Sequence, residues 1–436
     1  MSQQLSSDDS HRRAEPDVPK GFFSYLRSFG PGIVVAMSWV GTGDLIDNSV
    51  AGGNYGYALL WVLPLAVVLR FVFVNALGKY VLFNVRDDPS LIRGLARLHP
   101  AMGWLLLISF VLYTHLLMSF SLSAVGVAIN GLTGGAVSAF VGALIGAGSV
   151  FLVTARGVYQ VLENVLKGVL AIKVVTFIVA IVLVGVSWRA MLGGLAFDFP
   201  EQSGPFDATL VAASLVLATI GSMANLFYPE FLREKGWLAP RYRRLQQYDL
   251  LFGSIVVLFL GGVVWVLGAE VLHGAQGVSE ASDIADALAS AIGPVGAFIF
   301  YFGLLGAGWT VVAGSVFALG KMVVESLHVV RPQREGRYPE RGKDPVYIAV
   351  VIWGLSAVLW SLPGGPGFIP LVVIAHVLTA PFLVLIVIGV ITLLNSRHSM
   401  GPHRNSWKEN IALGLVATLV CIAAVQGFVQ AFTTMF

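Results

Sequence analysis

Residues 41–48 place carboxylates inside the first apolar segment of the chain. The stretch reads GTGDLIDN, so Asp44 and Asp47 lie at membrane depth if this segment crosses a bilayer. An ionised Asp inside a spanning helix costs about 3 kcal/mol, and such residues usually belong to an ion or substrate pathway. Gly41 and Gly43 favour a break in the helix, and the unwound carbonyls of broken helices bind ions in transporters. The alternative is a glycine kink at a helix-packing contact, with Asp47 near the membrane surface.

The sixth apolar segment has the same character. Residues 218–225, ATIGSMAN, form a stretch of small and polar side chains in the middle of that segment. Interruptions in the first and sixth segments, five segments apart, are typical of an inverted repeat of five helices. Glu230 follows five residues after Asn225, where it either lines the inner pathway or forms a salt bridge with Arg233 or Lys235.

The composition indicates a protein that crosses the membrane several times. Hydrophobic residues make up 56% of the 436 residues and charged residues only 12%, which is more apolar surface than a soluble domain can bury. Eleven apolar segments are long enough for a hydrocarbon core about 30 Å thick. They are residues 30–53, 57–84, 101–130, 136–154, 159–187, 207–233, 246–273, 288–327, 345–362, 367–394 and 409–433. No nucleotide-binding, zincin or hydrolase motif points to an enzyme.

The basic residues predict the orientation of these segments. Lys and Arg gather in the N-terminal region and in every second connection after it, whereas the opposite connections hold Arg189 alone beside several carboxylates. By the positive-inside rule, the N-terminus is cytoplasmic and, with eleven spans, the C-terminus is outside the cell membrane. The basic loops therefore need no nucleic-acid partner. We expect a disordered cytoplasmic tail over 1–27 and a single transmembrane domain over 28–436.

Several motifs resemble one family of transporters. GPG opens the first segment at residues 30–32, and AGG, YGY and LLW follow the interruption at 51–53, 55–57 and 59–61. This pattern resembles the Nramp (natural resistance-associated macrophage protein) transporters of divalent metals, over about residues 28–430. In that family GPG leads after eight residues to the metal motif DPGN.

The resemblance implies a fold, a mechanism and a set of partners. The fold is an all-α, LeuT-like membrane fold of eleven helices, in which helices 1 and 6 are broken. Its two inverted repeats of five helices cover about 30–187 and 207–394, and 409–433 is an additional helix. Transport then proceeds by alternating access around helices 1 and 6. The divalent metal ion is a substrate rather than a cofactor, the lipid bilayer is the other partner, and a monomer is compatible with the sequence.

The functional motifs depart from the family pattern. At the DPGN positions this chain has Gly41, Thr42, Gly43 and Asp44, so the first Asp is lost and a carboxylate stands one helical turn later. The soft Met ligand of the family's MPHN motif is replaced by Ser222, or by Gly221 if one residue is inserted, and the His of that motif is absent. The acidic pair of the third helix corresponds to uncharged residues at 121–124, which removes the family's proton carriers.

These changes predict a hard, oxygen-rich site. Carboxylate, hydroxyl and carbonyl oxygens suit Mg²⁺ or Mn²⁺ better than softer metals, and Mg²⁺ needs only one or two carboxylates. The departures resemble the Nramp-related branch associated with Mg²⁺ and favour transport without proton coupling. With Asp44 as the principal ligand, the predicted metal-site residues are Ser38, Gly41, Thr42, Asp44, Asp47, Thr219, Ser222 and Asn225, of which Ser38 and Thr219 contribute backbone carbonyls.

Other polar residues inside the segments have a functional and a structural interpretation. Glu230 and His376 are candidates for the ion or proton pathway, and His376 lies in the tenth helix, which closes the site in this fold. His115 is more simply a helix contact, and Arg70 and Lys79 are interpreted as structural. A carrier of the same fold for a small organic cation or an amino acid remains an alternative, as does a membrane receptor without transport.

Overall fold

The computed structural model describes residues 22–86, 88–197, 200, 208–220, 222–273, 281–365 and 368–435, and all regular elements in this part of the chain are helical. The α-helices are α1 Phe22–Ser28, α2 Pro31–Trp39, α3 Thr42–Tyr55, α4 Val62–Phe83, α5 Leu91–Ala96, α6 Met102–Leu132, α7 Ala139–Thr154, α8 Tyr159–Val184, α9 Trp188–Gly193, α10 Ala208–Ile220, α11 Phe227–Lys235, α12 Arg243–Leu267, α13 Ala281–Ile292, α14 Pro294–Val330, α15 Pro332–Arg337, α16 Pro345–Leu355, α17 Phe368–Asn395, α18 Arg397–Met400 and α19 Trp407–Met435. Short stretches of 3₁₀-helix are η1 Met223–Leu226, η2 Pro240–Tyr242, η4 Arg341–Lys343, η5 Ser356–Ser361 and η6 Gly401–His403, and η3 Gly268–Leu272 is a short π-helix.

The long helices have the length and surface of membrane spans. Among the described residues, five helical stretches are long and apolar enough to cross a bilayer unaided, and a sixth is a pair bent by 64°. The five are Val62–Phe83, Met102–Leu132, Tyr159–Val184, Pro240–Leu272 and Pro294–Val330. Apolar side chains such as Leu152 and Val182 are 79% and 75% exposed, as expected for side chains that face lipid. Each predicted segment coincides with a helix or with consecutive helices, and the count of eleven spans stays a prediction.

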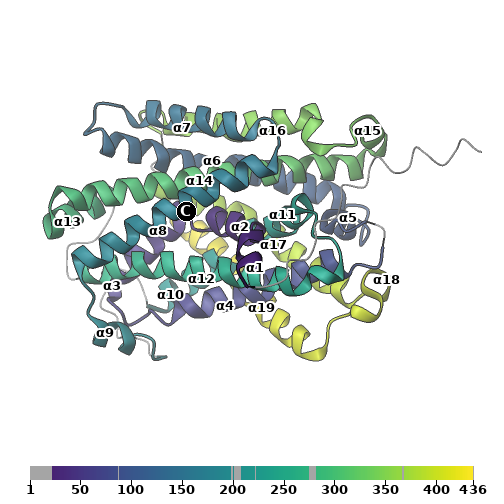
Figure 1. Cartoon of the computed structure of the whole chain (residues 1–436), viewed down its shortest axis with the longest axis horizontal. Coiled ribbons are helices and arrows are strands. Elements are labelled where there is room, and N and C mark those ends of the chain that lie inside the picture. The colour runs from purple at the N-terminus through teal and green to yellow at the C-terminus, as the bar shows by residue number, and fades with distance from the viewer. Residues whose placement is uncertain are drawn as a thin grey trace, which may run out of the picture.

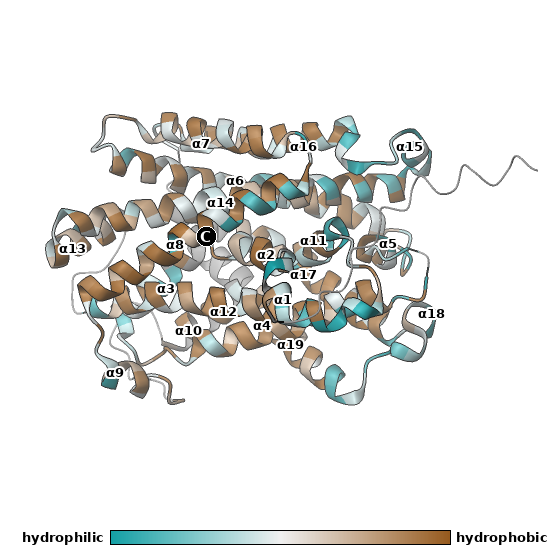
Figure 2. Ribbon diagram, in the orientation of Figure 1, coloured by the Kyte–Doolittle hydropathy of each residue, from teal (hydrophilic) through white to brown (hydrophobic). Residues whose placement is uncertain are grey.

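The two ends of the bundle differ in polarity. The long helices run side by side, with α5, α15 and α18 at one end and α3, α9 and α13 at the other (Figure 1). Hydrophilic residues gather at the end that carries α15 and α18 (Figure 2). The basic connections at 91–97, 331–343 and 397–408 thus share one end of the molecule, as the alternation of charge in the sequence predicted. Which end faces the cytoplasm stays a prediction.

The first predicted helix is broken, as the sequence indicated. Helix α2 ends at Trp39, Val40 leaves the helical conformation with φ −73° and ψ 79°, and α3 begins at Thr42. A Cβ atom on Gly41 would lie 2.8 Å from the side chain of Val311 on α14. Gly41 therefore allows the interrupted backbone to pack directly against α14.

The sixth predicted helix is broken in the same way. Helix α10 ends at Ile220, Ser222 is extended with φ −86° and ψ 131°, and the single turn η1 leads into α11. Residue 221 lies outside the described part of the chain. Both interruptions of the proposed inverted repeat are thus present at the positions predicted from the small and polar residues.

The GPG motif has a structural explanation. The backbone N–H groups of Gly30 and Gly32 donate to the carboxylate of Asp249 on α12, at 2.9 and 2.5 Å, and Asp249 is fully buried. Pro31 between them starts α2 and has no N–H to satisfy. A Cβ atom on Gly32 would overlap the backbone of Asp249. The motif therefore fixes the start of α2 against α12 by capping its N-terminal N–H groups with a buried carboxylate.

Two short helices lie outside the predicted spans. Helix α5 lies between the second and third predicted spans, and Ser90 caps its N-terminus. Residues 1–21 of the predicted tail lie outside the described residues, but α1 forms over Phe22–Ser28 at the end of that segment. The ring of Tyr25 packs edge-on against that of Tyr248 at 6.0 Å. This contact packs α1 against α12 and so stabilises helical structure at the end of the predicted tail.

Candidate functional site

The two helix breaks contact one another. The indole Nε1 of Trp39, the last residue of α2, donates to the carbonyl oxygen of Ala224 in η1 at 3.2 Å. Ser38 and Thr219, whose carbonyls were predicted as ligands, are both buried beside these breaks. The structure therefore brings the first and sixth predicted helices together at their interruptions, which is the arrangement required for a shared site.

Asn225 bridges the second break and leaves one polar atom unsatisfied. Its Nδ2 donates to the carbonyl oxygen of Ile220 at 2.8 Å and, more weakly, to that of Thr219 at 3.4 Å. The Asn225 side chain is fully buried, and its Oδ1 has no hydrogen-bond partner. A buried acceptor without a partner is costly, and a cation is a natural partner for it. Asn225 is thus the predicted ligand whose environment most favours an ion.

Ser222 serves as a cap in this conformation. Its Oγ accepts a hydrogen bond from the N–H of Ala224 at 3.2 Å and lies 3.1 Å from the hydroxyl of Tyr113 on α6. Met223, the neighbouring residue in η1, is 1% exposed. Ser38 bonds within its own helix, where its Oγ donates to Val34 at 2.9 Å. The hydroxyl groups of both serines are therefore occupied locally, and their availability to an ion depends on rearrangement of the breaks.

The backbone places the predicted carboxylates at the start of α3. Thr42 is the first residue of this helix and Asp44 stands in its first turn, where the helix macrodipole stabilises negative charge. The side chains of Thr42, Asp44 and His376 lie outside the described part of the structure. Asp47, one turn later, is partly buried. Among the side chains that the structure describes, no group of three or more His, Cys, Asp or Glu residues could hold a metal ion.

Arg70, which the sequence analysis interpreted as structural, also lies at the two helix breaks. It comes from α4 and is 2% exposed, and its Nε donates to the carbonyl oxygen of Thr219 at 2.6 Å. Its guanidinium carbon lies 4.8 Å from the centre of the Trp39 ring, within the range of a cation–π contact. The guanidinium thus touches the last turn of α10 and the last residue of α2. An Arg in the middle of an apolar segment was the available signal, but it does not reveal which helices the side chain reaches.

A second polar centre, the carboxylate cluster, lies further along α11. We define it as Glu230, Glu234 and Glu325, three carboxylates that surround Arg341 of η4. Arg341 Nη1 donates to Glu230 at 2.7 Å and to Glu325 at 2.8 Å, and its Nη2 donates to Glu234 at 3.0 Å. Burial opposes the charge of Arg341, but these carboxylates outweigh that effect and raise its pKa above the ordinary value. Glu230 therefore lies in an ion-pair network whose main partner is a loop residue.

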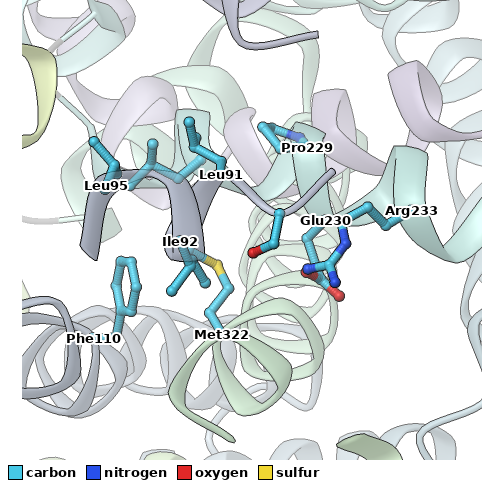
Figure 3. A pocket seen from close by; sticks show the side chains of 10 residues that line it. Leu91, Ile92, Leu95, Phe110, Pro229, Glu230, Arg233 and Met322 are labelled. Atoms are coloured by element: carbon cyan, nitrogen blue, oxygen red, sulfur yellow. The ribbon is translucent and has the colours of Figure 1, made fainter. Parts of the chain in front are cut away.

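Other cations complete the carboxylate cluster. Arg233 pairs with Glu325 and lies 3.5 Å from Glu230, while Lys321 on α14 lies 2.5 Å from Glu234. A small cavity of about 10 Å³ borders this network and is lined by residues of α5, α6, η1, α11 and α14. Glu230 and Arg233 stand at one side of it, opposite Ile92, Leu95 and Phe110 (Figure 3). The polar cluster and the apolar wall together leave room for about one water molecule beside Glu230.

The remaining predicted residues have structural partners. Glu163 and Lys167 form an ion pair at 2.6 Å, and Lys235 on α11 also pairs with Glu163. His115 stacks on Trp353 with ring centroids 4.2 Å apart and accepts from the indole N–H of Trp360 at 3.0 Å. These contacts agree with the interpretation of His115 as a helix contact. In the third predicted helix, Ser121 and Ala124 are buried at the positions of the family's acidic pair.

Comparison with known sequences identifies the family. The chain matches the family described as natural resistance-associated macrophage protein-like over residues 32–430. It belongs to the Nramp family. A divalent metal cation transporter, MntH 1, of Pseudomonas aeruginosa is 27% identical over 368 residues, which cover 80% of this chain and 81% of the relative. Another MntH transporter, from Granulibacter bethesdensis, is 22% identical over 431 residues, covering 94% of this chain and 90% of that one.

Solved structures confirm the predicted fold. A mutant form of a manganese transporter of Eremococcus coleocola superimposes with a TM-score of 0.75 at 15% identity, covering 94% of this chain and 88% of that one. MhsT in complex with L-phenylalanine superimposes with a TM-score of 0.54 at 18% identity, covering 92% and 98% of the two chains. The LeuT-like architecture expected from the Nramp motifs is therefore confirmed.

Proposed function

We propose that this Nramp-family protein carries a divalent cation, with Mg²⁺ or Mn²⁺ favoured, at a site between the two helix breaks. The observation that carries the proposal is the buried Oδ1 of Asn225, which has no hydrogen-bond partner at the point where the breaks meet. Asp44 in the first turn of α3 supplies the charge, and the carbonyls near Ser38 and Thr219 supply neutral oxygen donors. The divalent metal transporters among the relatives support the substrate class.

The donor set supports a preference for hard ions. The candidate ligands offer carboxylate, amide, hydroxyl and carbonyl oxygens, and the family's Met position holds Ser222. Oxygen ligands favour Mg²⁺ and Mn²⁺, whereas a thioether favours softer metals such as Cd²⁺. Because Mg²⁺ keeps several of its waters, a single principal carboxylate suffices for it.

The absence of acidic residues at two positions favours transport without proton coupling. Ser121 and Ala124 occupy the positions of the family's third-helix carboxylates, and both are buried. A serine hydroxyl does not ionise near neutral pH and an alanine side chain has no ionisable proton, whereas a carboxylate in a membrane is a typical proton relay. Glu230 is held by Arg341 and is therefore a poor substitute in this conformation.

The distribution of polar groups supports transport by alternating access. The carboxylate cluster ties together α11, α14 and η4 at the end of the bundle where α15 lies. At the opposite end a pocket of about 430 Å³ lies between Tyr57, Ser187, Gly194 and Glu270. We infer that one side of the site is closed by ion pairs in this conformation, and that these pairs separate when the site opens to that side.

Uptake into proteoliposomes tests the function. The purified chain should move Mn²⁺ and Mg²⁺ down a gradient, and a pH-sensitive dye inside the vesicles should report no proton entry that follows the metal. Vesicles with the Asp44→Ala variant are the matched control and should show only the leak of empty vesicles. Absence of metal uptake by a folded wild-type chain would refute the proposal, and proton influx in step with metal uptake would refute uncoupled transport.

A second candidate is a carrier of the same fold for a small organic substrate, such as an amino acid. Arg70 favours it, because a guanidinium binds carboxylates through paired hydrogen bonds and here stands between the breaks. The proteoliposome assay separates the two candidates. Exchange of labelled amino acids without metal uptake would support the organic carrier.

A further inference from the structure

We propose that Arg70 is a specificity-determining residue that holds one fixed positive charge at the two helix breaks and so weakens the binding of divalent cations. The inference rests on the proposed function, because it places the cation between the same breaks. Its structural basis is the position of one buried side chain. Arg70 reaches from α4 to the carbonyl oxygen of Thr219 at 2.6 Å and to the ring of Trp39 at 4.8 Å.

The charge of Arg70 is permanent and poorly screened. A guanidinium remains protonated at all physiological pH values, and the Arg70 side chain is only 2% exposed. Mobile ions screen surface charges but have little effect on buried ones. A metal ion bound near the carbonyl oxygen of Thr219 would therefore experience repulsion from Arg70 that salt cannot remove.

The same carbonyl connects Arg70 to the predicted ligand set. The Thr219 oxygen is a proposed metal ligand, and it accepts the hydrogen bond from Arg70 as well as the weak one from Asn225 Nδ2. The Thr219 carbonyl oxygen therefore already accepts two hydrogen bonds in this conformation, one for each of its lone pairs. A cation that uses this oxygen must share it with a guanidinium or displace it. Arg70 therefore lies where its charge affects how tightly the site binds an ion and which ionic charge the site prefers.

The carboxylates of the first helix explain why a cation can still bind. Asp44 and Asp47 bring two negative charges within one turn of α3, whereas the DPGN motif of the family has a single Asp. The positive charge of Arg70 offsets one of these two negative charges. Removing Arg70 should leave the site with excess negative charge and increase its attraction for multivalent ions.

A purely structural role for Arg70 predicts a different outcome. The guanidinium also completes the last turn of α10, where a positive charge interacts favourably with the carbonyl end of the helix. If that were its only role, neutral replacements would weaken ion binding or folding, and the effect would not depend on the charge of the ion. Electrostatic repulsion instead scales with ion charge. Ions of different charge therefore separate the two roles.

The experiment measures Mn²⁺ and Tb³⁺ binding to the purified full chain. The variants are R70Q and R70M, which are neutral, R70K, which keeps the charge, and K79Q as a control. Lys79 lies on the same helix but pairs with Glu409 at 2.8 Å, away from the breaks. R70Q and R70M should raise the affinity for Mn²⁺ by about tenfold or more and that for Tb³⁺ by about thirtyfold, because the repulsion grows in the ratio of the charges. R70K and K79Q should bind both ions like the wild type.

Each other outcome overturns the inference. Mn²⁺ binding to the wild type with no gain in R70Q and R70M would refute the role of Arg70 and leave the proposed function standing. No binding to any variant would refute both. Equal gains for Mn²⁺ and Tb³⁺ would exclude charge as the cause. If the neutral variants do not fold while R70K folds and binds normally, Arg70 is a structural residue and the inference fails.

Discussion

Arg341 Nη2 lies 2.7 Å from Oε1 of Glu230, so a residue of the loop after α14 is paired with a carboxylate on the second half of a broken helix. The same guanidinium also bonds to Glu325 on α14. Both carboxylates are almost completely buried, at 3% and 0% exposure. Charges buried in this way are favourable only while they remain paired, which makes this contact sensitive to any movement of α11.

The first prediction concerns this pair. Arg341→Gln leaves Glu230 and Glu325 with one cation fewer, and loss of one partner from a buried pair costs about 3–5 kcal/mol. The variant should therefore stabilise less strongly the conformation in which these ion pairs close the η4 end of the bundle. In a Cys421→Ser background, a cysteine introduced at Ser38 should react faster with a reagent added from the side of η4.

Lys343→Gln is the control for that experiment. Lys343 belongs to the same turn, but its pair with Glu340 is exposed on both sides, at 76% and 58% of the side chains, and such pairs contribute little. Its labelling rate should equal that of the wild type. Equal rates in the Arg341 variant would show that the carboxylate cluster does not close this side.

The second prediction concerns Asp44. Asp44→Ala should abolish Mn²⁺ binding while the chain stays folded, because removing a costly charge from a membrane helix does not itself destabilise it. Calorimetric titration measures the binding and a thermal melt reports the fold. Wild-type uptake by a well-folded Asp44→Ala chain would exclude Asp44 as the principal ligand.

The helix breaks were predictable from the sequence, whereas the contacts across them were not. Small and polar residues at 41–48 and 218–225 stand out in apolar segments, because local composition decides where a membrane helix can be interrupted. The hydrogen bond from Arg70 to Thr219 joins residues 149 positions apart. No local pattern encodes which helix a long side chain reaches. The predicted alternatives for Glu230 named Arg233 and Lys235, but its shorter contact is to Arg341, which only the folding of η4 brings near.

The third prediction concerns orientation. Residues 234–244 and 330–343 should be labelled from the cytoplasm and residues 274–286 from outside, following the distribution of Lys and Arg. Helices α15 and α13 stand at opposite ends of the bundle, as this requires (Figure 1). External labelling of 330–343 would contradict the positive-inside assignment and the eleven-span topology.

The fourth prediction concerns pH. Burial of Asp344 opposes its ionisation, but hydrogen bonds from Arg334, the N–H of Val346 and His328 outweigh this and hold its pKa below the ordinary value. Since the unfolded chain binds the proton more tightly, the stabilisation is present above about pH 4 and is lost as the pH falls further. Asp344→Asn should lower the melting temperature at pH 7 and flatten its decline below pH 4. A parallel decline in both proteins would contradict this role.

The last prediction concerns the hardness of the site. Ser222→Met restores sulfur at the family's ligand position and removes a hydroxyl that caps the N–H of Ala224 at 3.2 Å. Loss of this cap should cost about 1 kcal/mol, which the fold can tolerate. A thioether favours soft metals, so uptake of Cd²⁺ relative to Mn²⁺ should rise in the variant, while Ser222→Ala should lose the cap without the gain. Strong Cd²⁺ transport by the wild type, with no competition from Mg²⁺ or Mn²⁺, would refute the hard site. An unchanged ratio in Ser222→Met would instead place the ligand position at residue 221.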